Sequence, residues 1–343
     1  MAEIITNTLY VTTPGTSLHL DIDAVRIYHP DTGGRRLPLV RIDHIVAFGG
    51  VTITDELFHR CAADKRSVTW LSGSGRFRAR LIGPQGGNPL LRIAQHDALR
   101  EPAVRLSTGA GFVAGKLQNT RQLLLRAAAD AHGTRQAALR ETAQHIEASL
   151  PTIADATDLN VILGIEGQAA RRYVATWRHL LTTHAEVPAP NLRTSRPPTD
   201  PVNAALSFGY GMLRVAVHGA LEQVGLDPYI GFLHGIRPGK PSLALDMMEE
   251  FRQLLVDRMV FTAFNRQQLR KQHFHQHASG AHELTDDGRR TFLTLWSEAR
   301  ARQWPHPSLG RKITAALLPL LQARIMARFL RGDIPGYQAW TPA

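Results

Sequence analysis

The spacing of apolar residues changes near residue 85, and this change constrains the fold more than any other feature of the sequence. Before it, apolar residues form short runs separated by turn residues, for example residues 37–42 and 77–82. Short runs that alternate with polar residues are typical of β-strands. After residue 90, apolar residues recur every three or four positions almost to the last residue. This second spacing is typical of amphipathic helices.

The pattern predicts an α+β protein, with a small N-terminal β-strand domain followed by a larger all-α C-terminal domain. The stretch GPQGGNP at residues 83–89 is dense in Gly, Pro and Asn and interrupts both spacings. We therefore expect a β domain over residues 1–85, a linker over residues 86–95 and a helical domain over residues 96–343. Two domains are also ordinary for a chain of 343 residues.

The chain is strongly basic. Its 40 Lys and Arg residues exceed its 29 Asp and Glu residues, so the formal net charge is +11. Nine basic residues lie within residues 289–333, where only Glu298 and Asp333 are acidic. A charge of this size favours an anionic partner, with nucleic acid as the first candidate and a membrane surface as the second.

The single cysteine, Cys61, excludes an internal disulfide and a cysteine-based zinc site, and it fits a reducing compartment. The N-terminal sequence MAEIITNTLYVTTPG lacks the basic and apolar segments of a signal peptide. No apolar run approaches the 18 or so residues that a membrane span requires. We expect a cytoplasmic protein with no membrane partner.

Glu166 is a carboxylate on the apolar face of the helix predicted near residues 158–184. That face recurs at helical spacing and comprises Leu159, Ile162, Leu163, Ala170, Tyr173, Val174 and Trp177. An ionised carboxylate buried without a partner costs several kcal/mol, so something must compensate it. On this helix alone, a buried salt bridge and a bound metal ion explain Glu166 equally well.

A second unusual segment is YIGFLHGIRPGKPSLALDMMEEFR at residues 229–252. Two prolines and two glycines between His234 and Ser242 predict a rigid loop, and Ser242 is expected to cap the helix that follows. Asp246 and Glu249 are three residues apart, so their side chains project from one face and could share one cation. The helix macrodipole also favours acidic residues here, but it does not explain a histidine delivered to the same end.

A third segment begins at Asp200-Pro201, which is a typical start of a helix. Its polar stripe holds Asn203, Ser207, Tyr210 and Arg214. A solvated helix surface is the ordinary interpretation of such a stripe. Alternatively, the tyrosine and the asparagine could hydrogen-bond phosphate.

Together, LGIEGQAARRYV (163–174), DPVNAALSFGYGML (200–213) and the segment GFLHGIRPGKPSLALDMMEEFR (231–252) resemble the three signature blocks of the CRISPR-associated integrase of the spacer-acquisition module, the Cas one family. Their order, their spacing and the two-domain layout are also similar to that family's. The compact acidic helix looks most like the version of type I systems, subtype C. One departure is Phe251-Arg252-Gln253, where the family commonly has Phe-Arg-Pro, so we expect the helix to continue without a proline kink.

The resemblance implies a set of site residues. It identifies as catalytic Glu166, His234, Glu249, Asp246 and Tyr210, of which the first three are metal ligands. Asp246 is implied to support them or to bind a second ion, and Asn203 to support Tyr210. Contacts with DNA are expected at Asn203, Arg171, Arg172, Arg289, Arg290, Arg311 and Lys312.

The resemblance also implies an activity. One imidazole and two carboxylates suit Mg²⁺ or Mn²⁺ as the cofactor. The 3′-OH of a short DNA fragment would attack the phosphodiester at the edge of a CRISPR repeat, and water in the same role would cleave DNA. The family acts as a homodimer paired through its β domains, and two such dimers bridge a dimer of the Cas two protein.

Two other classes of function stay open at this point. A metal-dependent phosphoesterase on small substrates would use the same three ligands but would have little use for the basic helices. A non-catalytic basic DNA-binding scaffold would explain the charge and leave Glu166 unexplained. A metal ion between Glu166, His234 and Glu249 favours an enzyme, and an Arg or Lys in the same space favours the scaffold.

Overall fold

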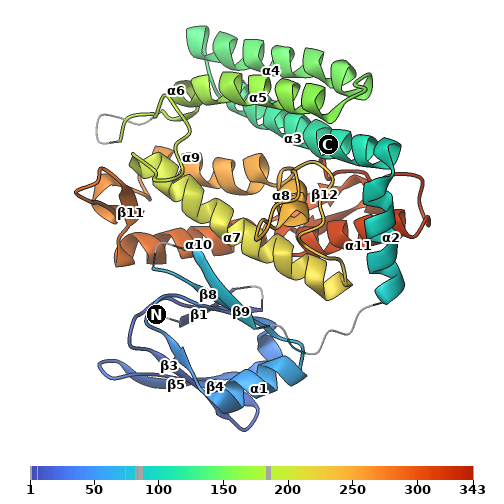
Figure 1. The fold of residues 1–343 in the computed structure, drawn as a ribbon. Coiled ribbons are helices and arrows are strands. Elements are labelled where there is room, and N and C mark those ends of the chain that lie inside the picture. The colour runs from blue at the N-terminus through green and yellow to red at the C-terminus, as the bar shows by residue number, and fades with distance from the viewer. Residues whose placement is uncertain are drawn as a thin grey trace.

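The computed structural model describes residues 2–5, 7–73, 75–81, 83, 88–182 and 187–342. A strand-rich N-terminal part, blue in Figure 1, lies against a larger and mostly helical part that runs from green to red. This mixed α/β architecture, with the strands first, confirms the order that the apolar spacing predicts. Within the described residues, no helix is long and apolar enough to span a membrane.

Two sheets and one helix form the N-terminal part. The larger sheet has the strand order β1-β2-β6-β8-β9, and the smaller has the order β5-β4-β3-β7. In chain order the elements are β1 (Ala2–Ile5), β2 (Thr8–Val11), β3 (Ser17–Asp21), β4 (Ala24–His29), β5 (Gly33–Pro38), β6 (His44–Ala47), β7 (Thr52–Ile53), α1 (Asp55–Ala63), β8 (Ser67–Leu71) and β9 (Phe77–Leu81).

All four residues of strand β2 are buried. Since alternate side chains point to opposite sides of a strand, both faces of β2 are covered. Leu9 and Val11 pack with Cys61 of α1 in the core of the N-terminal part. Tyr10 instead joins the core of the helical part. Phe48 stacks on Phe208 there, with ring centroids 5.9 Å apart. The larger sheet is thus fixed against the helices by apolar packing.

The helical part contains long helices and two short hairpins. Its helices are α2 (Pro89–Arg100), α3 (Pro102–Ala129), α4 (Gly133–Ala154), α5 (Leu159–Ala175), α6 (Trp177–Leu180), α7 (Pro201–Val224), α8 (Ser242–Met248), a π-helical turn (Arg252–Asp257), α9 (Arg258–Asn265), α10 (Asp286–Ala301) and α11 (Leu318–Leu330). The hairpins pair β10 (Phe274–Gln276) with β11 (His282–Leu284), and β12 (Gln303–His306) with β13 (Arg311–Thr314).

The prediction of an all-α C-terminal domain is therefore wrong in detail, because this part contains two hairpins. Their strands of three and four residues are too short to show an alternating pattern in the sequence. The predicted linker lies only in part within the described residues, since residues 84–87 fall outside them. Helix α2 already begins at Pro89, where the Asn88 side chain accepts a hydrogen bond from the Leu90 N–H at 3.0 Å. The domain limits themselves stay predictions.

Glu250 turns into the helical core, beside the segment 334–342. Its carboxylate accepts hydrogen bonds from Tyr337 Oη at 2.6 Å and from Gln322 Nε2 at 3.0 Å. The backbone N–H of Trp340 donates to it as well. Burial raises the pKa of Glu250 to about 8, although these hydrogen bonds lower it.

We expect the melting temperature to fall as the pH rises from about 5 to 8. The pKa of glutamate in the unfolded chain is about 4.3, so between that value and the folded-state value of about 8 the folded protein binds the extra proton and is stabilised by it. That stabilisation is complete below the unfolded-state pKa, decreases steadily as the pH rises between the two pKa values, and is gone above the folded-state pKa. Glu250→Gln should flatten the slope, and the exposed control Glu298→Gln should not. An unchanged slope in Glu250→Gln would assign the effect to another group.

Candidate active site

Asp246 of α8 organises the loop that carries His234. The Asp246 carboxylate is fully buried and accepts hydrogen bonds from the backbone N–H groups of Phe232 at 2.7 Å, Leu233 at 2.9 Å and His234 at 2.9 Å. The loop wraps so closely that a Cβ on Gly231 would lie 2.6 Å from Asp246 Oδ2. Only glycine fits there without a shift, so the sequence Gly-Phe-Leu-His is shaped to this carboxylate.

The same carboxylate fixes the His234 ring. His234 Nδ1 lies 2.6 Å from Asp246 Oδ1. Nδ1 is the donor, because a carboxylate only accepts hydrogen bonds, and Nε2 is the ring nitrogen left to bind a metal ion. A carboxylate behind a histidine is the usual support of a metal-binding imidazole. These contacts favour the supporting role for Asp246, in which it positions His234, over the alternative of a ligand to a second ion.

Ser242 does not act as the predicted N-cap of α8. The N-cap position is Pro241, and no side chain caps the helix. The Ser242 hydroxyl instead donates to the Gly235 carbonyl at 3.2 Å, which closes the loop after His234. The predicted cap of α7 is confirmed, since Asp200 accepts a hydrogen bond from the Asn203 N–H at 2.8 Å.

Glu166 of α5 and Glu249 come together around one cation, Lys116 of α3. Lys116 Nζ forms an ion pair with Glu166 Oε1 and lies 2.7 Å from Glu249 Oε2. All three side chains are mostly buried, with exposed fractions of 11% for Lys116, 24% for Glu166 and 5% for Glu249. Of the two explanations for Glu166, the structure shows the salt bridge.

Neighbouring charges oppose the effect of burial on the pKa values of Glu249 and Lys116. Burial alone would raise the pKa of Glu249, but the nearby Arg252 and Lys116 cations lower it overall, and His234 adds to this effect. Burial alone would lower the pKa of Lys116, but the Glu249 and Glu166 carboxylates raise it.

The cluster is not a preformed metal site. No group of three Asp, Glu, His or Cys side chains in the described part of the chain is close enough together to hold an ion. However, Glu249 Oε2 is buried and has no hydrogen-bond partner among the described residues, because its contact with Lys116 Nζ lacks hydrogen-bonding geometry. By their chemistry, two carboxylates that already share one cation, together with the His234 imidazole, form a suitable donor set for such an ion once the ammonium moves aside.

Tyr210 belongs to a second network that adjoins Glu249. Tyr210 Oη donates to Asp257 Oδ1 at 2.5 Å, and Tyr173 Oη donates to Asp257 Oδ2 at 2.8 Å. The Arg252 guanidinium lies 4.9 Å from the centre of the Tyr210 ring and 3.2 Å from Glu249 Oε1. Lys116, Tyr210 and Arg252 line a shared pocket of about 130 Å³.

A π-helical turn places two members of this network. Arg252 and Asp257 are its first and last residues. The expected continuous helix is therefore wrong, because α8 ends at Met248 and residues 249–251 form a turn before the wider π-helical turn, although no proline causes this break. Single π-turns inside helices often occur at functional sites.

The predicted DNA contacts have different environments. Asn203 is fully buried, where its side chain accepts from Arg193 Nη1 at 2.9 Å and donates to the Leu192 carbonyl at 2.8 Å. Its burial opposes a direct contact with DNA. Arg289 is also mostly buried and pairs with Asp286. The remaining predicted contacts are exposed, namely Arg171 and Arg172 on α5, Arg290 on α10, and Arg311 and Lys312 on β13.

Sequence reasoning missed Lys116, Arg193, Arg252 and Asp257. Lys116 could have been found, because it is a lone charge within the apolar run GFVAGKLQN, as Glu166 is within its own helix. Asp257 follows Leu254, Leu255 and Val256 and is fully buried. Nothing in the chain order indicates that Tyr173 and Tyr210 share it.

Comparison with solved structures defines the class of fold. A chain of a Cas6-RT-Cas1–Cas2 complex has a TM-score of 0.82 and 21% identity over 99% of this chain and 37% of that chain. A casposase bound to an integration product has a TM-score of 0.80 and 21% identity over 96% of this chain and 92% of that chain. The fold is that of Cas1-type proteins.

Comparison of sequences then identifies the family. The family model described as CRISPR associated protein Cas1 matches residues 9–298. A CRISPR-associated endonuclease Cas1 from Moorella thermoacetica is 42% identical over 335 residues, which cover 97% of this chain and 98% of the relative. The chain belongs to the Cas1 family.

Proposed function

We propose that this protein is a metal-dependent DNA endonuclease and integrase of CRISPR adaptation, which inserts short DNA fragments as new spacers by 3′-OH transesterification. The observation that carries the proposal is the convergence of Glu166 and Glu249 on one cation. The His234 ring, which Asp246 holds, supplies the third proposed ligand. Family membership and the names of the relatives support it.

Each residue of the cluster has a role in this proposal. Glu166, Glu249 and His234 Nε2 would hold Mg²⁺ or Mn²⁺. Such an ion polarises a phosphoryl oxygen and offsets the charge that builds up during displacement. Arg252, 3.2 Å from Glu249, supplies a fixed positive charge beside the scissile phosphate. Burial and Asp257 raise the pKa of Tyr210, so its hydroxyl keeps its proton and orients by hydrogen bonding.

DNA would approach across exposed basic residues. Arg171 and Arg172 are exposed on the same helix as Glu166, and the net charge of +11 favours backbone contacts. Contacts with phosphate position DNA without reading its sequence. Their strength falls steeply as salt concentration rises. Transfer that persists undiminished at high salt would favour the small-substrate phosphoesterase instead.

The partners are proposed on the same basis. A homodimer paired through the β domains, bridged to a second by a Cas2 dimer, would present two such sites. The likeness to a chain from a Cas1–Cas2 complex supports this assembly only through the fold. We also propose a cytoplasmic location and a type I, subtype C system, the latter because of the compact acidic helix.

The position of Lys116 between Glu166 and Glu249 favours the DNA-binding scaffold, as does the net charge of +11. A scaffold, however, gives no reason for the arrangement at Asp246, which leaves His234 Nε2 free. It also leaves Glu249 Oε2 buried with no hydrogen bond in the described structure. We therefore propose that the Lys116 ammonium holds the two carboxylates together and gives way to the divalent ion.

We expect Lys116→Met to destabilise the metal-free protein and to increase its stabilisation by Mn²⁺. Removing the ammonium leaves two carboxylates unpaired, which lowers the melting temperature without metal. The variant no longer competes with the ion, so the rise in melting temperature on adding Mn²⁺ should exceed that of the wild type. The exposed Lys271→Met is the control. A smaller rise in Lys116→Met than in the wild type would contradict displacement.

A further inference from the structure

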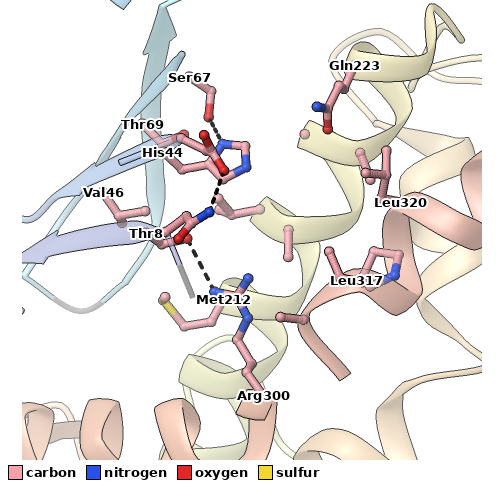
Figure 2. Close-up of a pocket in the computed structure, with 18 of the residues that line it drawn as sticks. Thr8, His44, Val46, Ser67, Thr69, Met212, Gln223, Arg300, Leu317 and Leu320 are labelled. Atoms are coloured by element: carbon pink, nitrogen blue, oxygen red, sulfur yellow. Dashed lines mark hydrogen bonds between the residues drawn. The ribbon is translucent and has the colours of Figure 1, made fainter. Parts of the chain in front are cut away.

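A cavity of about 350 Å³ lies between the two parts of the protein. Strands β2, β6, β8 and β9 form one side, and helices α7, α10 and α11 form much of the other (Figure 2). Among the described residues that line it, neither Glu166, nor His234, nor Glu249 is present. The cavity is thus separate from the candidate active site.

Arg300 of α10 brings to this cavity a positive charge that has no ion-pair partner among the described residues. Its exposed fraction is 9%. Its Nη1 lies 3.0 Å from Tyr10 Oη and 3.4 Å from Thr8 Oγ1, which are neutral hydroxyls, and Figure 2 shows it extending from its helix toward Thr8. No carboxylate lies within ion-pairing distance of Arg300 in the described structure. A buried charge without a counter-ion is costly, so this guanidinium is suited to an anion that enters the cavity.

The other charged groups of the cavity do not cancel Arg300. Arg80 pairs with Glu222, its Nη1 lying 2.8 Å from Glu222 Oε2. Arg80 Nε is buried and has no hydrogen-bond partner among the described residues. The Asp43 carboxylate is 56% exposed, lies 4.0 Å from Arg66 and accepts a hydrogen bond from Asn7 at 2.9 Å. The lining therefore has an excess positive charge and a spare donor.

The rest of the lining is neutral or apolar. His44 Nδ1 lies 2.6 Å from Ser67 Oγ. Burial, Arg300 and Arg80 lower the pKa of His44 to about 4, so its ring is uncharged at neutral pH. The opposite wall is formed by Met212, Val215, Ala216, Ala220, Leu317 and Leu320. A ligand with one anionic end and a less polar body matches this distribution.

We propose that the cavity binds a small phosphate monoester of mononucleotide size, with its phosphate at Arg300 and its body against α7. A guanidinium matches phosphate with a fork of two donors. A volume of 350 Å³ falls within the range of about 300–1,000 Å³ that is usual for small-molecule sites. Such a ligand would touch both parts of the protein, since Thr8 belongs to β2 and Arg300 to α10. The inference is independent of the proposed nuclease activity.

Titration calorimetry of the full chain with adenosine 5′-monophosphate tests the proposal, with adenosine as the comparison. We expect the monophosphate to bind at least about tenfold more tightly than adenosine, because only the monophosphate supplies a charge-assisted hydrogen bond. Binding should also raise the melting temperature. A monophosphate that gives no saturable binding at about 1 mM, or that binds no more tightly than adenosine, would overturn the proposal.

Two variants locate the binding. Arg300→Met should weaken monophosphate binding at least about tenfold, while the exposed neighbour Arg302→Gln should bind as the wild type does. Ala216→Leu keeps Arg300 and fills space in the cavity, so it too should weaken binding. It covers the case in which Arg300→Met fails to fold. Wild-type affinity in Ala216→Leu, or in a folded Arg300→Met, would show that the ligand binds elsewhere and would overturn the assignment.

Discussion

Replacing Glu166 with alanine will abolish strand transfer in the presence of Mn²⁺ and leave DNA binding measurable. The substitution removes one of the two carboxylates that share Lys116, and with it a proposed ligand of the metal ion. Loss of one preorganised charged group at a phosphoryl-transfer site costs at least about 100-fold in rate. Transfer of a labelled fragment into repeat DNA measures the activity, and gel shift measures the binding.

The exposed Glu141→Ala is a matched control, which we expect to transfer strands at the wild-type rate. His234→Ala should fail as Glu166→Ala does, and EDTA should abolish the wild-type reaction. Unchanged transfer by Glu166→Ala would refute its assignment. Loss of transfer together with loss of DNA binding would mean that Glu166 supports the fold or DNA binding and not the chemical step, and a wild type that binds DNA without transferring strands would point to the basic scaffold.

Asp246→Asn will lower both stability and strand transfer. The Asp246 carboxylate accepts three backbone N–H groups and the His234 ring without any exposure to water. An amide replaces one accepting oxygen with an N–H group that faces these donors. Leaving buried donors unsatisfied costs about 1–3 kcal/mol each, so we expect a loss of about 3 kcal/mol in the free energy of unfolding.

Thermal and denaturant unfolding measure that loss, and Asp287→Asn is the control because its side chain is 69% exposed. Transfer should fall by about 10- to 100-fold, as is usual when the group behind a metal-binding histidine is changed. Wild-type stability together with wild-type transfer in Asp246→Asn would contradict the positioning role.

Periodicity could predict the order of the elements and not all of their limits. Helical spacing continues across residues 130–132, so it does not mark the turn that separates α3 from α4. Strands β10 to β13 were missed for the opposite reason, since each is too short to show a period. Their pairing depends on neighbours that become adjacent only on folding.

The site residues that could be predicted are those whose type is unusual at their position. Glu166 is a carboxylate on an apolar helix face, and His234 directly precedes a loop rich in Pro and Gly. The partners of these residues were not predictable, because one sequence does not say that Lys116 lies beside both glutamates. Asn203 was misplaced for a similar reason, since the segment with Leu192 and Arg193 folds over its helix and buries it.

Anomalous diffraction from crystals soaked in MnCl₂ tests the central claim most directly. The account predicts a peak bonded to oxygens of Glu166 and Glu249 and to His234 Nε2, at distances of about 2.0–2.6 Å, with Lys116 Nζ moved away from both carboxylates. A Lys116 ammonium that still bridges Glu166 and Glu249 at saturating Mn²⁺, with no peak beside them, would contradict it.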